Sequence, residues 1–452
     1  MDKRQEILKS AKKEKIRFIR LWFTDILGFL KSFAITLDEL EEALYEGKGF
    51  DGSSVEGFAR IDESDMVALP DPDTFTILPW GPSVDIKVGR MFCDIKNPNG
   101  SPYDGDPRFV LKRMLKKVKD MGYNFYVGPE LEFFYFKNST TKAEPIDFGG
   151  YFDLTPMDIA SDLRKKTVIA LESMGIPVEY SHHEVAPSQH EIDLRYCEAL
   201  KMADTVMTYR LVVKEIALQN GVYATFMPKP VFGENGSGMH TNMSLFSAKG
   251  GSASGGKGDR NAFFDKNDKL HLSKTAKHFI AGLMHHAQEI TSVTNQWVNS
   301  YKRLVPGYEA PIYISWAQKN RSDLIRIPMY KPGKEKATRV EYRAPDPACN
   351  PYLAFAAMLA AGIEGIKKEY KLKAPIEKNV YEISEEERKK LGIDTLPGDL
   401  YEAILLTSKS KLVKETLGEH VFSKFLENKK IEWDNYRARV TSYELDRYYS
   451  IL

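Results

Sequence analysis

The segment RVEYR, which begins at residue 339, places a carboxylate between two guanidinium groups. Successive side chains of an extended strand point to opposite faces, so Arg339, Glu341 and Arg343 share one face while Val340 and Tyr342 take the other. A wholly charged face, followed by a Pro-rich turn and a long apolar stretch, indicates that these charges serve a function.

Carboxylates recur on other strand-like segments. They are Glu130 and Glu132 in GPELEFFYF, and Glu184 and Glu191 in HHEVAPSQHEID, joined by His240 in GENGSGMHTNMSL and by Glu341. The period-2 spacing places the first two on one face roughly 7 Å apart, although a strand with one wet face shows the same alternation. Carboxylates with one imidazole suit Mg²⁺ or Mn²⁺, and the lack of thiolate argues against structural zinc. Because five negative charges cannot share a small cavity unpaired, we expect two or more metal ions.

Nearby histidines and arginines complete this set of charged residues. His182, His183 and His190 adjoin the glutamates, and we expect each to be structural and to orient them. Guanidinium groups, which match carboxylate and phosphate bidentately, gather within a short span: Arg303, Arg321, Arg326, Arg339 and Arg343. Together the two signs of charge predict a phosphoryl-transfer site.

The elements that must position these residues form a mixed pattern. A helix is predicted over 3–14, a hairpin around Gly28, and further helices over 109–122, 156–174, 198–220 and 273–296, between the strands that carry the charges. The turn-rich stretch 97–108 predicts a domain boundary, with domains at 1–105 and 106–452. The apolar stretch 353–363 reads as a buried helix that is too short to span a bilayer. The Gly- and Ser-rich segment 247–261 predicts an outer loop.

Composition limits the possible functions. The chain has 452 residues and a formal net charge of +1, so no overall field favours nucleic acid or an anionic membrane. Its three cysteines are scattered and form no CxxC pair, and the N-terminus lacks an apolar run behind its basic residues. We expect a cytoplasmic enzyme.

The segments FDGSSVEGF, GPELEFF, HHEVAPSQHEID, NGSGMHTNMSL, RLVPGYEAP, NRSDLIRIP and RVEYRAPDPACNPYLAFAAML resemble, in order, the signature segments of type I glutamine synthetase, in its shorter branch. The resemblance implies an α+β fold with an N-terminal β-grasp domain and a larger α/β catalytic domain of the glutamine synthetase/guanido kinase type. It implies ATP-dependent joining of ammonia to L-glutamate through a γ-glutamyl phosphate, a reaction of nitrogen assimilation. It also implies a homo-dodecamer of two stacked hexameric rings, with active sites between subunits.

The same resemblance assigns roles to residues. It implies one metal on Glu132, Glu184 and Glu191 and a second on Glu130, His240 and Glu341. It implies a glutamate site at Asn235, Gly236, Arg303, Glu309, Arg321 and Arg343, and ATP contacts from Glu179, Ser244, Arg321, Arg326, Lys336 and Arg339. Asp51 resembles the base that deprotonates ammonium, which the family lends to the active site across the subunit interface. Glu309 resembles the residue of a loop that closes over the ammonium, and Arg321 a third catalytic residue.

Regulation is also implied by the resemblance. Arg60 matches a position through which glutamine inhibits its own synthesis, unless it is a surface arginine paired with Asp62 or Glu63. Phe18, Arg20 and Arg90 offer an anion pocket for 2-oxoglutarate, and a PII-type protein is a further possible regulator. Tyr381 lies near a tyrosine that is modified in the longer branch, and we expect it to be unmodified here.

Three other functions compete with this one. A ligase for a larger amine keeps the metals and glutamate site but loses Asp51 or Glu309, and both are present. A non-enzymatic relative loses metal ligands, whereas all six positions are filled. A dinuclear phosphatase needs neither so many arginines nor a separate glutamate pocket.

Overall fold

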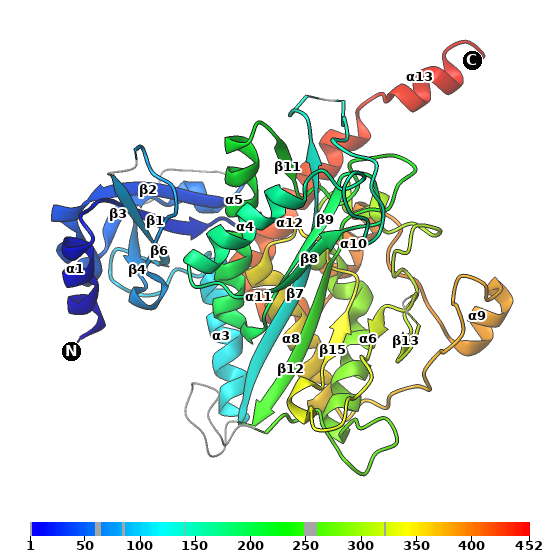
Figure 1. Ribbon diagram of the computed structural model, residues 1–452. Helices are drawn as coiled ribbons and strands as arrows, with labels where there is room; N and C mark the ends of the chain where they lie inside the picture. Colours follow the sequence, from blue (N-terminus) through cyan, green and yellow to red (C-terminus); the bar gives the residue numbers. More distant parts are fainter. Residues whose placement is uncertain (1, 59–64, 84–85, 141, 248–259, 321) are drawn as a thin grey trace.

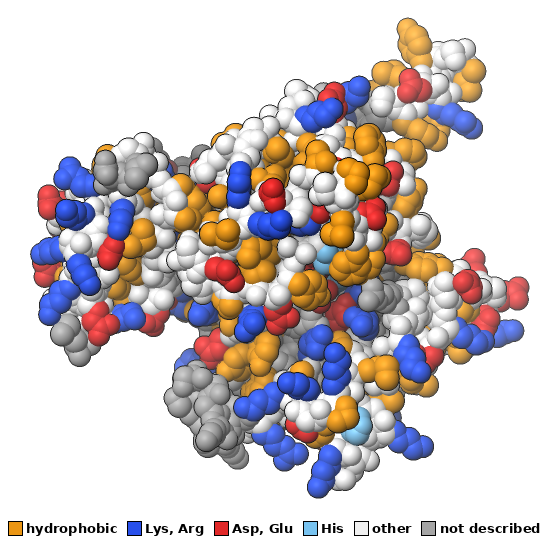
Figure 2. All heavy atoms as spheres, viewed as in Figure 1, with side chains coloured by type: hydrophobic (Ala, Val, Ile, Leu, Met, Phe, Trp, Pro, Cys, Tyr) orange, Lys and Arg blue, Asp and Glu red, His pale blue; other side chains and the backbone are white. Residues whose placement is uncertain are grey.

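The computed structural model describes residues 2–58, 65–83, 86–140, 142–247, 260–320 and 322–452. Helices and mixed sheets confirm the predicted α+β class (Figure 1). On the face shown in Figure 2, acidic and basic side chains are interspersed, in keeping with a net charge of +1.

A small sheet forms the N-terminal part, drawn in blue in Figure 1. Its strands are β1 (Ile16–Thr24), β2 (Leu30–Thr36), β3 (Lys48–Asp51), β4 (Asp65–Pro70), β5 (Thr76–Ile77) and β6 (Lys87–Lys96). The order is β2-β1-β6-β4-β3, with β5 also paired to β6. β1 and β2 form the predicted antiparallel hairpin, and Gly28 in its turn has a φ of 83° that an L side chain rarely adopts. The helices of this part are α1 (Lys3–Lys13) and α2 (Leu40–Glu46).

A larger sheet forms the centre of the molecule (Figure 1). Its main path is β13-β14-β15-β12-β7-β9-β8, and β10 and β11 also pair with β7. The strands are β7 (Tyr123–Phe136), β8 (Val178–His183), β9 (Gln189–Leu194), β10 (Cys197–Glu198), β11 (Tyr223–Thr225), β12 (Met239–Ser247), β13 (Trp316–Ala317), β14 (Ile325–Arg326) and β15 (Val340–Tyr342). β11 ends at Thr225, shortly before Pro228 and Pro230, which lack the N–H group that a ladder needs.

Helices cover the sheets and fill the core. They are α3 (Pro107–Asp120), α4 (Ser161–Ser173), α5 (Ala199–Gln219), α6 (Lys274–Thr294), α7 (Ser300–Arg303), α8 (Pro351–Lys367), α9 (Glu385–Leu391), α10 (Leu400–Ser408), α11 (Lys411–Leu417), α12 (Glu419–Arg437) and α13 (Ser442–Tyr448). α4 begins later than predicted because Asp158 accepts a hydrogen bond from the Ala160 N–H and pairs with Arg164, which holds the preceding segment in turns. None of the described helices combines the length and apolar character needed to cross a bilayer.

The apolar stretch 353–363 lies in α8, which is buried as predicted. α8 packs against α6 at unusually short range, because a Cβ atom on Gly362 would come within 2.1 Å of the Phe279 ring, and one on Gly282 within 2.2 Å of the Ala361 carbonyl oxygen. The segment RVEYR and the apolar stretch that follows it therefore have a structural role as well as a chemical one. The strand of this segment, β15, presents charge on one side, and the helix that follows fills the core.

Candidate active site

A cavity of about 720 Å³ opens over the charged face of the large sheet. Its lining includes all six side chains predicted to bind metal: Glu130, Glu132, Glu184, Glu191, His240 and Glu341. It also includes Arg326, Arg339 and Arg343, so the predicted charged face of RVEYR does point into a site.

Strand register brings these residues together. On β7, Glu130 lies opposite His240 of β12, and Glu132 lies opposite Glu191 of β9. β12 in turn pairs with β15, where Glu341 lies opposite Asn242. Because side chains alternate along each strand, the paired positions all project from one face.

Among the described residues, potential ligand atoms form three groups, each with its atoms within 4.8 Å of one another. Two of the groups line the cavity, while Asp147, His183 and His190 form a buried group behind it. Glu130, His240 and Glu341 form one group, and this is one of the two predicted triads. The other group contains Glu184 and Glu191 with His182, which the sequence had placed among the orienting residues.

Glu132, predicted for that second triad, lies between the groups. One carboxylate oxygen accepts hydrogen bonds from the Gly238 N–H (3.0 Å) and Gln189 Nε2 (2.9 Å). The other lies 3.9 Å from His240 Nε2. This position leaves Glu132 available to either group.

The electrostatics of the cavity suit a cation. Burial, and next the nearby Glu184 carboxylate, raise the pKa of Glu132, while burial followed by the Asp193 charge raises the pKa of Glu191. Burial, reinforced by Arg343, lowers the pKa of His240 and keeps its imidazole neutral. Crowded buried carboxylates beside a neutral imidazole are the donor set that Mg²⁺ or Mn²⁺ prefers, so the residues fit the divalent metal that was predicted.

The arginines of the cavity are already oriented by hydrogen bonds. Glu341 accepts hydrogen bonds from Arg326 (2.8 Å) and Arg343 (2.6 Å). Arg339 Nε donates to the Asn242 side chain at 2.9 Å. Arg303, which is 4% exposed, donates to the backbone carbonyls of Ala344 and Arg343. These contacts hold the guanidinium groups rigidly beside the carboxylates.

Glu309 lies on the loop at the rim of the cavity. It is exposed and has a φ of 55°, a left-handed conformation that is uncommon for a glutamate. Its carboxylate lies 3.5 Å from Asn235 Nδ2 on the facing segment. The next residue, Ala310, accepts a hydrogen bond from the Tyr381 hydroxyl, so Tyr381 forms part of the wall.

Several predicted site residues lie elsewhere. Asp51 ends β3 in the small sheet, Glu179 is exposed on β8, Ser244 is buried in β12 and Lys336 is exposed before β15, and the described lining of the cavity includes none of the four. Asn235 and Gly236 do line it. Arg321, Arg60 and most of the segment 247–261 lie outside the described residues.

The pocket predicted for 2-oxoglutarate on the small sheet contains one buried arginine, Arg90, and one exposed arginine, Arg20. Arg90 is buried between the rings of Trp22 and Phe92 and donates to the Thr74 carbonyl at 2.7 Å. Burial lowers its pKa to about 10. Arg20, its partner in the register of β1 and β6, is exposed.

Sequence reasoning missed the aromatic side of the cavity, which Tyr151, Phe152 and Tyr180 form. For Tyr180 a signal existed, because Tyr180, His182 and Glu184 recur at period 2 and share one face. The two histidines behind the ligands act as supports. His183 lies 3.0 Å from an Asp147 oxygen and 2.7 Å from the Glu184 carbonyl oxygen, and His190 Nδ1 lies 2.9 Å from Arg164.

Comparisons with known proteins agree over the whole chain. Residues 104–448 match the model of the glutamine synthetase catalytic domain, and residues 15–98 match that of the glutamine synthetase beta-Grasp domain, which confirms the predicted β-grasp fold. A "Glutamine synthetase" of Mycolicibacterium smegmatis is 55% identical and covers 100% of both chains. One of Methanosarcina mazei is 52% identical, covering 99% of this chain and 98% of the relative. A solved structure titled "GmaS/ADP complex-Conformation 1" is 30% identical with a TM-score of 0.87, covering 98% and 99% of the two chains.

Proposed function

This chain belongs to the glutamine synthetase family, and from that membership we propose that its carboxylate-lined cavity carries out the family's reaction, the ATP-dependent joining of ammonia to L-glutamate. The observation that supports this assignment is the meeting of all six predicted metal-binding side chains with four arginines in one cavity. The reaction needs such a site because two anions, a carboxylate and a triphosphate, must approach each other.

Two divalent ions would occupy the cavity, one held by Glu130, His240 and Glu341 and the other by Glu184 and Glu191 with Glu132 or His182. When bound, such ions neutralise charge on a transferring phosphoryl group. Arg339 and Arg326 would contact the phosphates of ATP, and Arg321 would join them. The more distant Glu179, Ser244 and Lys336 would reach the nucleotide outside this cavity.

Glutamate would lie between Arg343, Arg303, Asn235 and Gly236. In the first step an oxygen of its side-chain carboxylate attacks the γ-phosphorus of ATP, the bond from that phosphorus to the β–γ bridging oxygen breaks, and ADP leaves. The product is γ-glutamyl phosphate, an acyl phosphate with a good leaving group. Guanidinium groups fixed at 2.6–2.8 Å from Glu341 are preorganised, so they stabilise the developing charge without reorganising.

In the second step ammonia attacks the acyl carbon and inorganic phosphate leaves with the electrons of the C–O bond. Ammonium predominates near neutral pH and is not a nucleophile, so a carboxylate must first remove its proton. Asp51 would be this base and Glu309 would cover the site, excluding water that hydrolyses the acyl phosphate. The position of Glu309 on the rim, 3.5 Å from Asn235, suits this covering role.

Asp51 lies at the end of β3 and not in the lining of its own chain's cavity. We therefore propose that it acts in the cavity of a neighbouring subunit, within a dodecamer of two hexameric rings. Glutamine acting through Arg60, 2-oxoglutarate near Arg20, and a PII-type protein are the proposed effectors.

The deciding experiment measures phosphate release from ATP with glutamate and either ammonium or a panel of larger amines. We expect release that depends on ammonium and on Mg²⁺ or Mn²⁺, and glutamine as the product. Release with a larger amine alone would replace this proposal by an amine ligase. Release that needs no glutamate would leave a phosphatase.

A further inference from the structure

A second cavity, of about 730 Å³, lies outside the catalytic site. It is bounded by the β1–β2 turn at Leu27–Leu30, one face of α5, the segment after β11, and α12. Its walls are largely aromatic and aliphatic: Phe29, Phe226, Trp297, Met207 and Leu211 contribute to them. A cavity of this size and character is typical of a site for a small molecule.

The aromatic wall is partly open to solvent. The Phe29 ring is 48% exposed although its centroid lies 5.7 Å from that of Trp297. Trp297 is fixed in place because its indole N–H donates to the Ala348 carbonyl at 3.0 Å and because the Lys429 ammonium lies 4.0 Å from its ring centroid. An exposed ring beside a fixed one offers a flat apolar ligand a face to stack on.

Three cations surround this apolar space. Arg210 and Lys214 lie one turn apart on α5, and Lys302 lies on α7 with its ammonium 5.6 Å from the Tyr436 ring centroid. Within the described ranges no carboxylate forms an ion pair with any of the three. Arg210 is only 8% exposed, and its Nε atom has no hydrogen-bond partner among the described residues.

Glu432, the acidic residue in the described lining, does not neutralise these three cations. Glu432 accepts hydrogen bonds from the Val298 N–H and from Lys429 Nζ, both at 3.0 Å. Its charge is thereby used by a buried lysine that is not one of the three cations. The cavity therefore combines an apolar body with a surplus of positive charge.

We propose that this cavity binds a small amphipathic anion, a flat apolar body that carries one carboxylate, sulfonate or phosphate group. The body would lie against Phe29 and Trp297, and the anionic group would face the exposed Lys214 and Lys302. The buried Arg210 guanidinium, which donates to the Cys349 carbonyl at 2.7 Å, would add positive charge behind them. This inference goes beyond the proposed synthetase activity, because the ligand is neither a substrate nor a product of that reaction.

One chain segment connects this cavity to the catalytic site. Asn299, in its lining, exchanges hydrogen bonds of 2.7 and 3.0 Å with the backbone of Lys229, and the Pro228 carbonyl accepts from the Ser237 N–H at 2.8 Å. The segment between these contacts carries Asn235 and Gly236, which line the catalytic cavity. A ligand here would therefore shift the KM for glutamate, a part of the inference that rests on the proposed function.

The test uses the full-length protein and two fluorescent probes that share one body. 8-Anilino-1-naphthalenesulfonate carries a sulfonate, whereas N-phenyl-1-naphthylamine lacks it. We expect the sulfonate probe to bind with one site per chain and to accept excitation energy from tryptophan. That transfer should fall in Trp297→Phe and stay unchanged in Trp80→Phe, a tryptophan outside the cavity lining.

Variants separate the two parts of the ligand. Replacing Lys214 and Lys302 together by alanine should weaken the sulfonate probe about threefold to tenfold and leave the neutral probe unchanged. Phe29→Ser should weaken both probes, and Lys201→Ala, an exposed lysine on the same helix outside the lining, should weaken neither. Added salt should weaken only the sulfonate probe.

Equal binding of the sulfonate probe to wild type and to the double lysine variant would overturn the proposal. So would a stoichiometry far below one per chain, the result expected if a second copy of the chain covers the cavity. Binding readouts do not depend on catalysis, so they hold even if the synthetase assignment fails. An unchanged KM for glutamate at saturating probe would overturn the coupling alone.

Discussion

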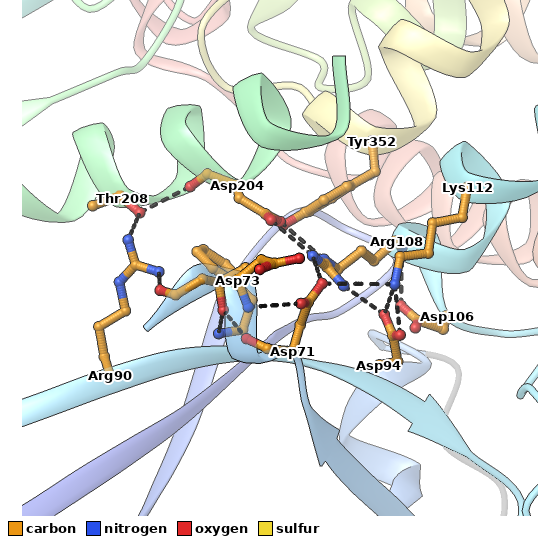
Figure 3. A network of polar contacts seen from close by, with 12 residues as sticks. Asp71, Asp73, Arg90, Asp94, Asp106, Arg108, Lys112, Asp204, Thr208 and Tyr352 are labelled. Carbon is orange, nitrogen blue, oxygen red and sulfur yellow. Dashed lines mark hydrogen bonds and ion pairs between the residues drawn. The ribbon is translucent and has the colours of Figure 1, made fainter. Parts of the chain in front are cut away.

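Two groups of buried carboxylates in this protein differ in the source of their positive charge. In the catalytic cavity, glutamates from β7, from β9 and from the segment between β8 and β9 face one another, and burial with nearby carboxylate charge raises the pKa of Glu132 and Glu191. At the junction of the small and large sheets, aspartates instead surround the buried guanidinium of Arg108 (Figure 3). The first group needs a cation from solution, while the second contains its own.

Hydrogen bonds from Arg108 and Lys112 balance the negative charge of the aspartates at this junction. Arg108 on α3 donates to Asp204 at 3.0 and 2.9 Å, to Asp94 at 2.5 Å and to Asp71 at 2.7 Å. Lys112 adds two further hydrogen bonds to Asp94, as Figure 3 shows. Asp71 and Asp94 belong to the small sheet region and Asp204 to α5, so one arginine ties the two parts together. The comparison teaches that Glu132 and Glu191, which form no ion pair with an arginine or lysine among the described residues, differ from the aspartates around Arg108 in having room for an added cation.

The largest effect should follow from Glu191→Gln, which removes one ligand charge but keeps the shape. Loss of a positioned cation should lower phosphate release by about 10³-fold. In EDTA the variant should unfold at the same urea concentration as wild type or a higher one, because a repulsive charge has been removed. Phosphate release and circular dichroism in urea provide the two measurements.

Glu172→Gln, an exposed glutamate on α4, is the matched control and should change neither quantity. A Glu191→Gln protein that is clearly less stable than wild type in EDTA would show that this carboxylate is structural. The distinction between the two clusters would then be lost.

Arg108→Met should have the opposite effects, a loss of stability with little change in activity. It leaves the buried Asp204 and the half-buried Asp71 and Asp94 near one another without the guanidinium, and breaking a buried ion network costs about 3–5 kcal/mol. The urea midpoint should fall sharply, while phosphate release per folded protein changes little. Lys116→Met on the same helix removes only an exposed pair with Asp120 and should cost less than about 0.5 kcal/mol. Equal midpoints for the two variants would contradict the assignment.

The sequence predicted the catalytic group because its signal is local. Charged residues repeat at period 2 within a few positions, as in Glu130 and Glu132 or in Arg339, Glu341 and Arg343. The register of the strands then brings these short sets together in the sheet. The junction has no such signal, since Asp204 lies 96 residues from Arg108 along the chain. The same reason explains why Asp51 lies apart from the cavity, because the placement of a residue on another sheet depends on packing that periodicity does not encode.

The pH dependence of the junction sharpens the contrast. Burial tends to raise the pKa of Asp94, but Arg108 and Lys112 outweigh it and lower that pKa below its ordinary value. A depressed carboxyl pKa stabilises the fold above the pKa of the unfolded chain and is lost as pH falls through the folded value. Asp94→Asn should therefore lower stability by about 1–3 kcal/mol at pH 7 and much less near pH 3. Parallel urea titrations of the two proteins across that range test this. A constant difference would show that charge is not responsible.

The smallest effect concerns Asp25, a buried carboxylate intermediate between the two groups. One of its oxygens lies 3.5 Å from the Lys31 ammonium, and the other accepts the Phe29 N–H at 2.8 Å. Burial is the main cause that raises its pKa to about 6. A raised carboxyl pKa means that folding favours the protonated form, so its contribution is present below the unfolded pKa and is lost as pH rises through about 6. Asp25→Asn keeps an oxygen for Phe29 and does not ionise. Relative to this variant, wild type should lose about 1–2 kcal/mol of stability between pH 4 and pH 7, opposite in sign to Asp94. If wild type instead gains stability over that interval, Lys31 supplies enough charge for Asp25 to behave as a member of the paired group.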